Sequence, residues 1–253
     1  MKSQAIFLCY KTRYSTEKQV KMDLKGKKIL ITGGSSGLGK AIAKLMIDQG
    51  AELVITGRNE NKLMRVAQEI GCKAVVFDMA DEQSIQTKAA EVLGLLEGQL
   101  DVLVNNAGIG DFDLLQDVKL ESFQQVFQIN VFGLAMLTQS VLPALKKSKG
   151  DIVNIASTAA GKGFAHGSVY AGSKFALRGM TQCWQAELRK HDIRVVLINP
   201  SEVPTAFNVD DRSEKELMDG KLTPMEIAHT IVCSLQMDKR GFIPEVTVWA
   251  TNP

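Results

Sequence analysis

Two segments of the sequence place a tyrosine four residues before a lysine: YSTEK at Tyr14 to Lys18 and YAGSK at Tyr170 to Lys174. On a helix, residues four apart lie on one face. A lysine there can lower the pKa of the phenol from about 10 toward neutral pH, which would make the tyrosine a proton donor or acceptor. The spacing fits a catalytic pair and a coincidence equally well, so the surroundings of each pair decide.

The second pair has the surroundings that catalysis needs. It begins a long amphipathic stretch, SVYAGSKFALRGMTQCW, which predicts a helix over about 168–190. Ser157 stands thirteen residues before Tyr170, at the end of the apolar strand pattern DIVNIAS. Strand carboxyl ends line the ligand crevice of open α/β sheets, so this hydroxyl can hold a substrate oxygen. Thirteen residues before Tyr14 stands Met1, and we interpret the first pair as a coincidence.

Around these residues the chain alternates strand and helix patterns from residue 27 onward. Short apolar runs such as KKILITG, ELVITG and DVLVNNAG are separated by amphipathic stretches, including those at about 82–96, 120–147, 168–190 and 224–236. Seven strands result. Apolar strands separated by helices predict an α/β fold with a doubly wound, seven-stranded parallel sheet (a Rossmann fold) in a single domain, residues 24–253.

The N-terminal segment differs from the rest in charge. Residues 1–28 hold eight Lys and Arg against two Asp and Glu, whereas the remaining residues hold 22 and 26. We expect residues 1–23 to form a basic, flexible arm. Contact with nucleic acid or membrane is the alternative, but the arm lacks interleaved aromatics and a nucleic-acid-binding module, so no nucleic-acid partner is expected.

Targeting and metal-binding patterns are also weak. The apolar run AIFLCY spans six residues, too few for a signal-peptide core or a membrane span. The four cysteines are widely separated and form no ligand or disulfide pattern, and the three histidines have no ligand spacing. We therefore expect a cytoplasmic protein that binds no metal and no membrane.

A glycine-rich loop follows the first predicted strand. In TGGSSGLGK, Gly33, Gly37 and Gly39 stand at the turn into a helix that starts near Leu38. Glycines there let backbone amides approach a pyrophosphate at the positive end of the helix. The strand–loop–helix context predicts a dinucleotide site, to which Ser35, Ser36 and Leu38 also belong.

The end of the second strand bears on which dinucleotide binds. An acid there would bind a ribose 2′-hydroxyl, whereas an arginine would pair with a 2′-phosphate. The sequence ITGRNE places Gly57 in the acid's position and Arg58 next to it. This favours NADP(H), and Glu60 leaves NAD(H) possible.

Over about residues 24–250, these motifs resemble those of the short-chain dehydrogenase/reductase family. TGGSSGLG resembles the family's cofactor loop, NNAG at 105–108 its fourth-strand motif, and Asn130, Ser157, Tyr170 and Lys174 its catalytic tetrad. The resemblance implies that Tyr170 exchanges a proton with the substrate oxygen, which Ser157 holds. It implies that Lys174 binds the nicotinamide ribose and acidifies Tyr170, and that Asn130 supports a water beside Lys174.

Further cofactor contacts are implied by the resemblance alone. Asp78 would hold the adenine amino group. One position departs from the family pattern, because Ser201 stands where a glycine is usual and serine tolerates positive φ poorly. The loop after the sixth strand could therefore follow another path. The remaining implied contacts are Met79, Asn106, Ala107, Gly108, Pro200, Val203 and Thr205.

The function expected from these features is NADPH-dependent reduction of a small carbonyl compound, or the reverse oxidation of an alcohol. A 3-oxoacyl-acyl-carrier-protein reductase is the alternative enzyme, and a catalytically silent sensor of NADP(H) is the alternative of another class. The resemblance implies a homo-oligomer, a tetramer or a dimer. Residues 206–222 are expected to cover the site, and Phe164 and His166 could face the substrate or solvent.

Overall fold

The computed structural model describes residues 24–205, 207 and 220–251. The predicted basic arm, the Tyr14 pair and most of the segment expected to cover the site lie outside the described residues.

Seven parallel strands form one sheet in the order β3-β2-β1-β4-β5-β6-β7. The strands are β1 (Lys28–Ile31), β2 (Glu52–Gly57), β3 (Lys73–Val76), β4 (Val102–Asn105), β5 (Asp151–Ile155), β6 (Arg194–Pro200) and β7 (Glu245–Val248). The predicted doubly wound α/β fold is confirmed. The direction of winding reverses between β1 and β4, and ligands of such sheets bind at the strand carboxyl ends beside that point.

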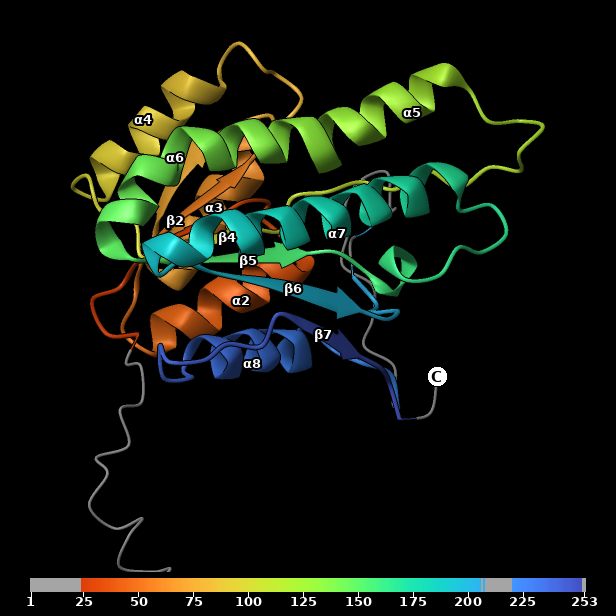
Figure 1. The fold of residues 1–253 in the computed structure, drawn as a ribbon. Coiled ribbons are helices and arrows are strands. Elements are labelled where there is room, and N and C mark those ends of the chain that lie inside the picture. Colours follow the sequence, from red (N-terminus) through yellow and green to blue (C-terminus); the bar gives the residue numbers. More distant parts are fainter. Residues whose placement is uncertain (1–23, 206, 208–219, 252–253) are drawn as a thin grey trace, which may run out of the picture.

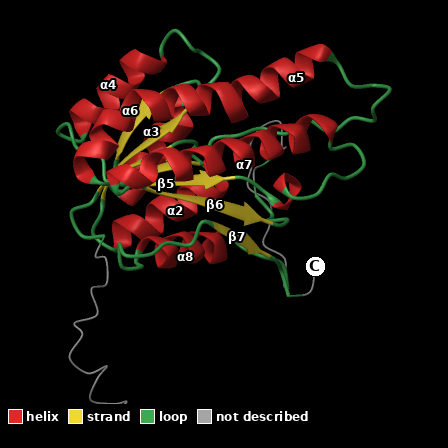
Figure 2. Ribbon diagram, in the orientation of Figure 1, coloured by secondary structure: helices red, strands yellow, loops and turns green. Residues whose placement is uncertain are grey.

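Helices cover both faces of the sheet (Figures 1 and 2). One layer consists of α2 (Gly37–Asp48), α3 (Glu60–Ile70) and α8 (Pro224–Leu235). The opposite layer consists of α4 (Ile85–Leu95), α6 (Leu134–Ser148) and α7 (Ser168–Leu188). Side chains alternate along each strand, so Ile29 and Ile31 of β1 join the first core while Leu30 joins the second.

The predicted helix over 120–147 is divided into α5 (Leu120–Phe127), a π-helical turn η1 (Gln128–Gly133) and α6. The whole stretch Leu120–Ser148 is long and apolar enough to cross a membrane by length and composition. Half of its most apolar window is buried inside the protein, as is usual for a core helix of a soluble protein.

Buried amides tie the helices of this layer to the sheet. Asn105 Nδ2 at the end of β4 donates to Asn154 Oδ1 in β5 (2.9 Å) and to Thr138 Oγ1 in α6 (3.0 Å). Asn154 Nδ2 in turn donates to Thr181 Oγ1 in α7 (2.8 Å). The position of α7, which carries Tyr170, is thereby fixed against two strands.

At the opposite end of the sheet, a buried ion pair joins the starts of β5 and β6. The Nε and Nη2 atoms of Arg194 each lie 2.8 Å from a carboxylate oxygen of Asp151. The guanidinium also donates to the carbonyls of Leu235, the last residue of α8, and of Met237 beyond it, and Lys239 lies 3.0 Å from Asp151. Both members of the pair are buried, and the Asp151 side chain is fully so.

Asp151→Ala is therefore expected to destabilise the protein by about 3–5 kcal/mol, because it leaves a buried guanidinium without its partner. Urea unfolding followed by circular dichroism at fixed protein concentration measures the effect. Glu91→Ala is the control, because Glu91 forms an exposed pair with Lys88 on α4 and its loss should leave the unfolding midpoint nearly unchanged. Equal unfolding midpoints for the two variants would show that the buried Asp151–Arg194 pair does not stabilise the protein more than an exposed pair does.

Candidate active site

In the loop between β1 and α2, two glycine positions leave no room for a larger side chain. Gly37 has φ +51°, and a Cβ at Gly39 would lie 2.2 Å from the carbonyl oxygen of Gly33. Ser36 holds the N-cap position of α2 without a side-chain capping bond, and the first turn carries no acid. Backbone N–H groups at this helix end can therefore bind an anion. The cradle fits the pyrophosphate of a dinucleotide.

The segment after β4 supports this loop. Thr32 Oγ1 accepts hydrogen bonds from the backbone N–H groups of Asn106 and Ala107, each at 3.0 Å. The side-chain amide of Asn106 donates to the carbonyls of Thr32 (2.9 Å) and Gly33 (3.1 Å). Asn106 therefore positions the glycine loop. Gly108 lies beside the predicted catalytic side chains, since a Cβ there would be 3.6 Å from Lys174 Nζ.

The ends of β2 and β3 close one side of the cradle. A Cβ at Gly57 would lie 3.2 Å from Ser35 Oγ, so the loop and the end of β2 are in contact. Arg58 is exposed beside this contact, just before Asn59, whose side chain caps α3. Asp78 follows β3 and accepts from the N–H of Ala80 (2.9 Å). The residues expected around the adenosine half of the cofactor thus lie at neighbouring strand ends.

Tyr170, Ser157 and Lys174 meet at the carboxyl end of β5. Ser157 begins the short helix η2 (Thr158–Ala160), accepts from the N–H of Ala159 (3.1 Å) and hydrogen-bonds to the Tyr170 hydroxyl. Lys174 Nζ donates to the carbonyl of Ile155 (3.0 Å) and lies 5.7 Å from the centre of the Tyr170 ring. The structure brings together three of the four predicted catalytic residues by direct contact or near contact.

Asn130 joins the same group from the π-helical turn η1. Its side chain exchanges two hydrogen bonds with the backbone of Ile109 (3.0 and 2.8 Å) and donates to Ser173 Oγ (3.0 Å). Ser173 donates to the carbonyl of Tyr170 (2.7 Å). The π-helical turn also lies close to the segment after β3, since a Cβ at Gly133 would lie 2.1 Å from the Met79 carbonyl oxygen. Turns of this kind often occur at functional sites.

Ser173 is a site residue that sequence reasoning missed. It is fully buried and links the side chain of Asn130 to the backbone of Tyr170. Its position inside YAGSK, directly before Lys174, was the signal available in the sequence.

Burial changes the acidity of both members of the Tyr–Lys pair. It raises the pKa of the Tyr170 phenol to about 12, although the hydrogen bond with Ser157 acts in the opposite direction. Burial also lowers the pKa of Lys174 to about 8. The prediction that Tyr170 has a lowered pKa is wrong, because removing the phenol from water disfavours phenolate. A protonated tyrosine lies next to a lysine that titrates near neutral pH.

The loop after β6 reaches the glycine loop despite its serine. The non-glycine residues with positive φ in the described part of the chain are Glu97, Lys149, His166 and Asp192. Ser201 is outside this group, so its backbone does not require glycine, and its N–H bonds to the Val248 carbonyl (2.9 Å). The buried Thr205 then packs against Gly37, at whose position a Cβ would lie 3.1 Å from Thr205 Cβ. The serine at 201 therefore causes no positive-φ strain in this segment, in which Val203 packs on the core and Pro200 ends β6.

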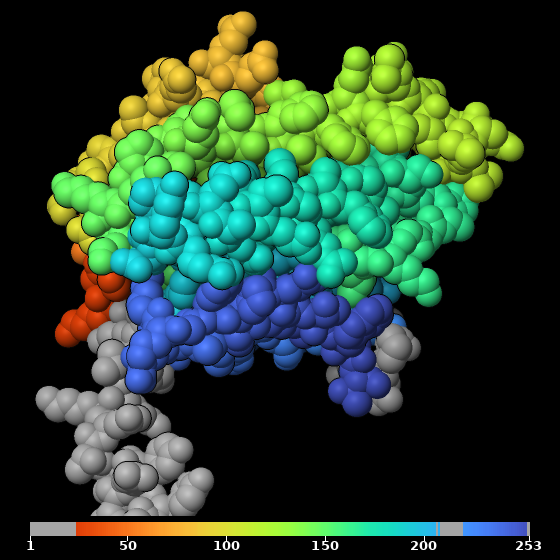
Figure 3. All heavy atoms as spheres, viewed as in Figure 1, coloured from red at the N-terminus to blue at the C-terminus, as the bar shows by residue number. Residues whose placement is uncertain are grey.

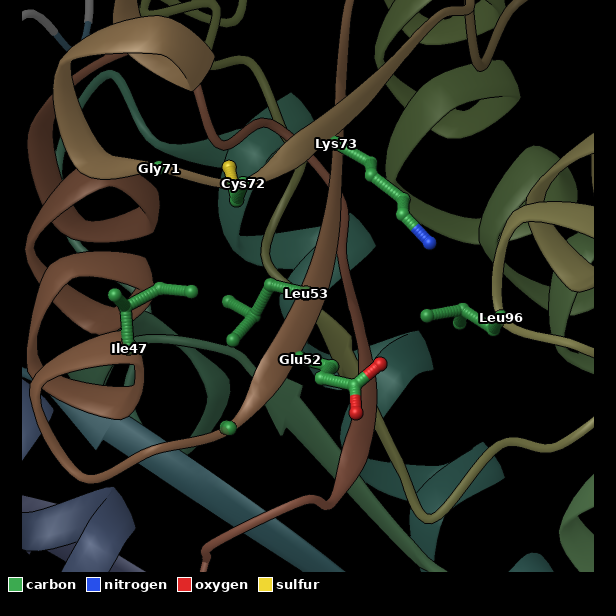
Figure 4. A pocket seen from close by; sticks show the side chains of 8 residues that line it. Ile47, Glu52, Leu53, Gly71, Cys72, Lys73 and Leu96 are labelled. Carbon is green, nitrogen blue, oxygen red and sulfur yellow. The ribbon is translucent and has the colours of Figure 1, made fainter.

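A pocket of 290 Å³ lies away from these residues, at the amino ends of β2 and β3 (Figure 4). Apolar side chains line much of it, and burial raises the pKa of its Cys72 thiol to about 11, which keeps the thiol protonated. It has none of the site residues described above. The lining residues are Ile47, Ala51, Glu52, Leu53, Gly71, Cys72, Lys73 and Leu96.

Two solved structures resemble this fold closely. An alcohol dehydrogenase from Thermococcus sibiricus complexed with 5-hydroxy-NADP superposes with a TM-score of 0.84 at 26% identity, covering 90% of this chain and 98% of that one. A metagenomic short-chain oxidoreductase in complex with NADP has a TM-score of 0.77 at 31% identity, covering 89% and 97%.

Sequence comparison leads to the same group of proteins. Dehydrogenase/reductase SDR family member 7B of Xenopus laevis is 31% identical over 252 residues, covering 89% of this chain and 77% of the relative. The model of the family described as short chain dehydrogenase matches residues 27–216, which include the glycine loop and all four tetrad positions. The chain belongs to the short-chain dehydrogenase/reductase family and is an oxidoreductase.

Proposed function

We propose that the protein is an NADPH-dependent carbonyl reductase, which in reverse oxidises the corresponding alcohol. The observation that carries the proposal is the hydrogen bond between the buried Tyr170 hydroxyl and Ser157, beside Lys174 and next to the glycine cradle. When bound, NADPH supplies the hydride that the carbonyl carbon receives.

The proton roles follow from the acidities. A phenol with its pKa raised to about 12 is protonated at neutral pH, so Tyr170 can donate its proton to the carbonyl oxygen. Ser157 holds the same oxygen. Lys174, with its pKa lowered to about 8, can return a proton to the tyrosine. Alcohol oxidation would use the same residues in reverse, with Tyr170 as the proton acceptor.

The cofactor preference rests on the adenosine side of the cradle. The N-terminus of α2 would hold the pyrophosphate, Asp78 the adenine, and the exposed Arg58 a 2′-phosphate. The complexes of the two similar structures with NADP compounds support NADP(H). Glu60 begins α3 beside Arg58 and leaves NAD(H) as a weaker alternative.

We further propose a homo-oligomer, a tetramer or a dimer, in the cytoplasm. Helices α5, α6 and α7 form the broad face seen in Figure 3, coloured green to cyan. Large apolar side chains remain exposed on these helices and on η1 between α5 and α6, as is common at contacts between subunits. They are Leu120, Phe123, Phe132, Met136 and Phe175.

Tyr170→Phe is expected to lower kcat for carbonyl reduction by roughly 10²- to 10⁴-fold, because it removes the proton donor. The dissociation constant for NADPH should change little, since one hydroxyl is lost. Tyr14→Phe is the matched control and should retain full activity. NADPH oxidation and fluorescence titration measure the two quantities. An active Tyr170→Phe variant would exclude the proposed role, and tight NADPH binding without turnover of any carbonyl by the wild type would favour the sensor.

Arg58→Ala is expected to weaken NADPH binding by about ten- to a hundredfold, because charge-assisted hydrogen bonds contribute about 1.5–3 kcal/mol. NADH binding should remain unchanged. Arg65→Ala is the control, because Arg65 is an exposed arginine further along α3. Adding Gly57→Asp should shift the preference to NADH, since Ser35 Oγ is the nearest atom to the new side chain and can move. Equal wild-type affinities for NADPH and NADH would contradict the assignment.

The lowered pKa of Lys174 has a measurable effect on stability. Between about pH 8 and pH 10.5 the unfolded chain keeps a proton on this lysine that the folded protein has released. Stability rises with pH where the unfolded state binds more protons. From pH 8 to 9.5 the wild type should therefore gain about 1 to 2 kcal/mol relative to Lys174→Met.

Urea unfolding of both proteins at these two pH values measures the gain, and the raised pKa of Tyr170 acts above this window. Lys190→Met replaces an exposed lysine just after α7 and should follow the pH trend of the wild type. A constant difference between the wild type and Lys174→Met over this range would show that Lys174 is not desolvated.

A further inference from the structure

Two phenylalanine rings contact the Tyr170 ring and a third contacts one of them, each from the segment after a different strand. The ring centres of Phe112, after β4, and Phe207, after β6, lie 5.3 and 5.5 Å from the centre of Tyr170. Phe164, after β5 and η2, lies 6.1 Å from Phe112. All are within the range of favourable aromatic contacts. From the sequence, Phe164 was considered for the substrate side and Phe207 belongs to the segment 206–222 expected to cover the site, whereas Phe112 was not predicted.

Local contacts hold these rings in place. Phe164 packs on the backbone of Gly167, where a Cβ would lie 2.8 Å from its ring, and His166 between them has φ +67°. The N–H of Phe207 donates to Thr205 Oγ1 (3.3 Å), and its ring packs on the cluster that contains Tyr170. The rings are therefore positioned parts of the site.

The exposure of the rings differs from that of Tyr170. Tyr170 is 9% exposed, whereas Phe112 and Phe164 are 36% and 51% exposed. Scattered apolar side chains are ordinary on a protein surface, but a contiguous group beside a reactive hydroxyl indicates a binding surface. It offers flat apolar area to a ligand whose carbonyl reaches Tyr170.

Charges around the rings also bear on the ligand. Half-buried Asp111 and Asp113 flank Phe112, whereas Lys162 near Phe164 is exposed. Carboxylates that are partly removed from water repel an anion more strongly than solvated cations attract it, because solvent screens the exposed groups. This charge distribution favours an uncharged ligand.

We propose that the substrate is an uncharged ketone or aldehyde with an aromatic or alicyclic ring next to the reacting carbonyl, and that Phe112, Phe164 and Phe207 determine this specificity. The inference rests on the proposed carbonyl reduction. The rings would stack on the substrate ring while Ser157 and Tyr170 bind its oxygen.

The test compares kcat/KM for three activated carbonyl compounds with NADPH. They are 1-phenylpropane-1,2-dione (aromatic, uncharged), pentane-2,3-dione (aliphatic, uncharged) and benzoylformate (aromatic, anionic). The first should exceed each of the others by roughly tenfold or more, since small differences in apolar contact change kcat/KM by about 10- to 200-fold.

Phe112→Ala, Phe164→Ala and Phe207→Ala should each raise KM for the phenyl dione and remove roughly tenfold of its kcat/KM. Their kcat/KM for pentane-2,3-dione should fall by much less than their kcat/KM for the phenyl dione, and an NADPH affinity near the wild-type value establishes that the variants fold. Leu115→Ala is the matched control, because Leu115 lies in the same loop as Phe112 and is 84% exposed.

Failure of this inference differs from failure of the proposed function. Equal kcat/KM for the two diones, a preference for benzoylformate, or equal losses on both diones in the variants would overturn the substrate class while carbonyl reduction stands. NADPH binding without oxidation by any of the three compounds would contradict carbonyl reduction itself.

Discussion

The site depends on the hydrogen bonds that join the carboxyl ends of β1 and β4. Thr32 receives the N–H groups of Asn106 and Ala107, and the Asn106 amide holds the carbonyls of Thr32 and Gly33. This is where the order of the strands reverses, so helices leave the sheet toward opposite faces on either side. The resulting gap is where α2 presents its N-terminus and where the segments after β5 and β6 can approach it. These hydrogen bonds therefore help to hold the glycine loop in place relative to the four predicted catalytic residues.

Lys174 illustrates the energetic conflict within that site. Its ammonium group is buried, which disfavours its charged form, and its described hydrogen-bond partner is the neutral carbonyl of Ile155. A carboxylate at this place would stabilise the charge and hold the proton too firmly for transfer. The neutral partner leaves the lysine near its titration point. The same burial keeps Tyr170 protonated.

Much of this arrangement could be predicted from the sequence. Apolar runs of four to seven residues gave all seven strands, because a parallel sheet covered on both faces needs them. Ser157 and Tyr170 could be paired because both motifs stand at a strand end and a helix start. The direction of the Tyr170 pKa shift could not be predicted, since it depends on burial by groups far away in the chain. Phe112 and Phe207 carry no motif, and their approach to Tyr170 exists only after β4, β5 and β6 are aligned. The π-helical turn also escaped prediction, because the apolar pattern over 120–147 indicates one continuous helix; the close approach of Gly133 in this turn to the Met79 carbonyl is visible only in the structure.

The first residue of β5 is Asp151, which forms the buried ion pair with Arg194, and Ser157 lies two residues beyond the end of the same strand. The two ends of one short strand thus have separate roles: one anchors the sheet to the end of α8, and the other leads to the Ser157 hydroxyl, which is proposed to hold the substrate oxygen. Substitutions in the loops around the hydroxyl do not touch the anchor. Because of this separation, loop residues near the site can be substituted and the substrate changed without affecting the ion pair that stabilises the amino ends of β5 and β6.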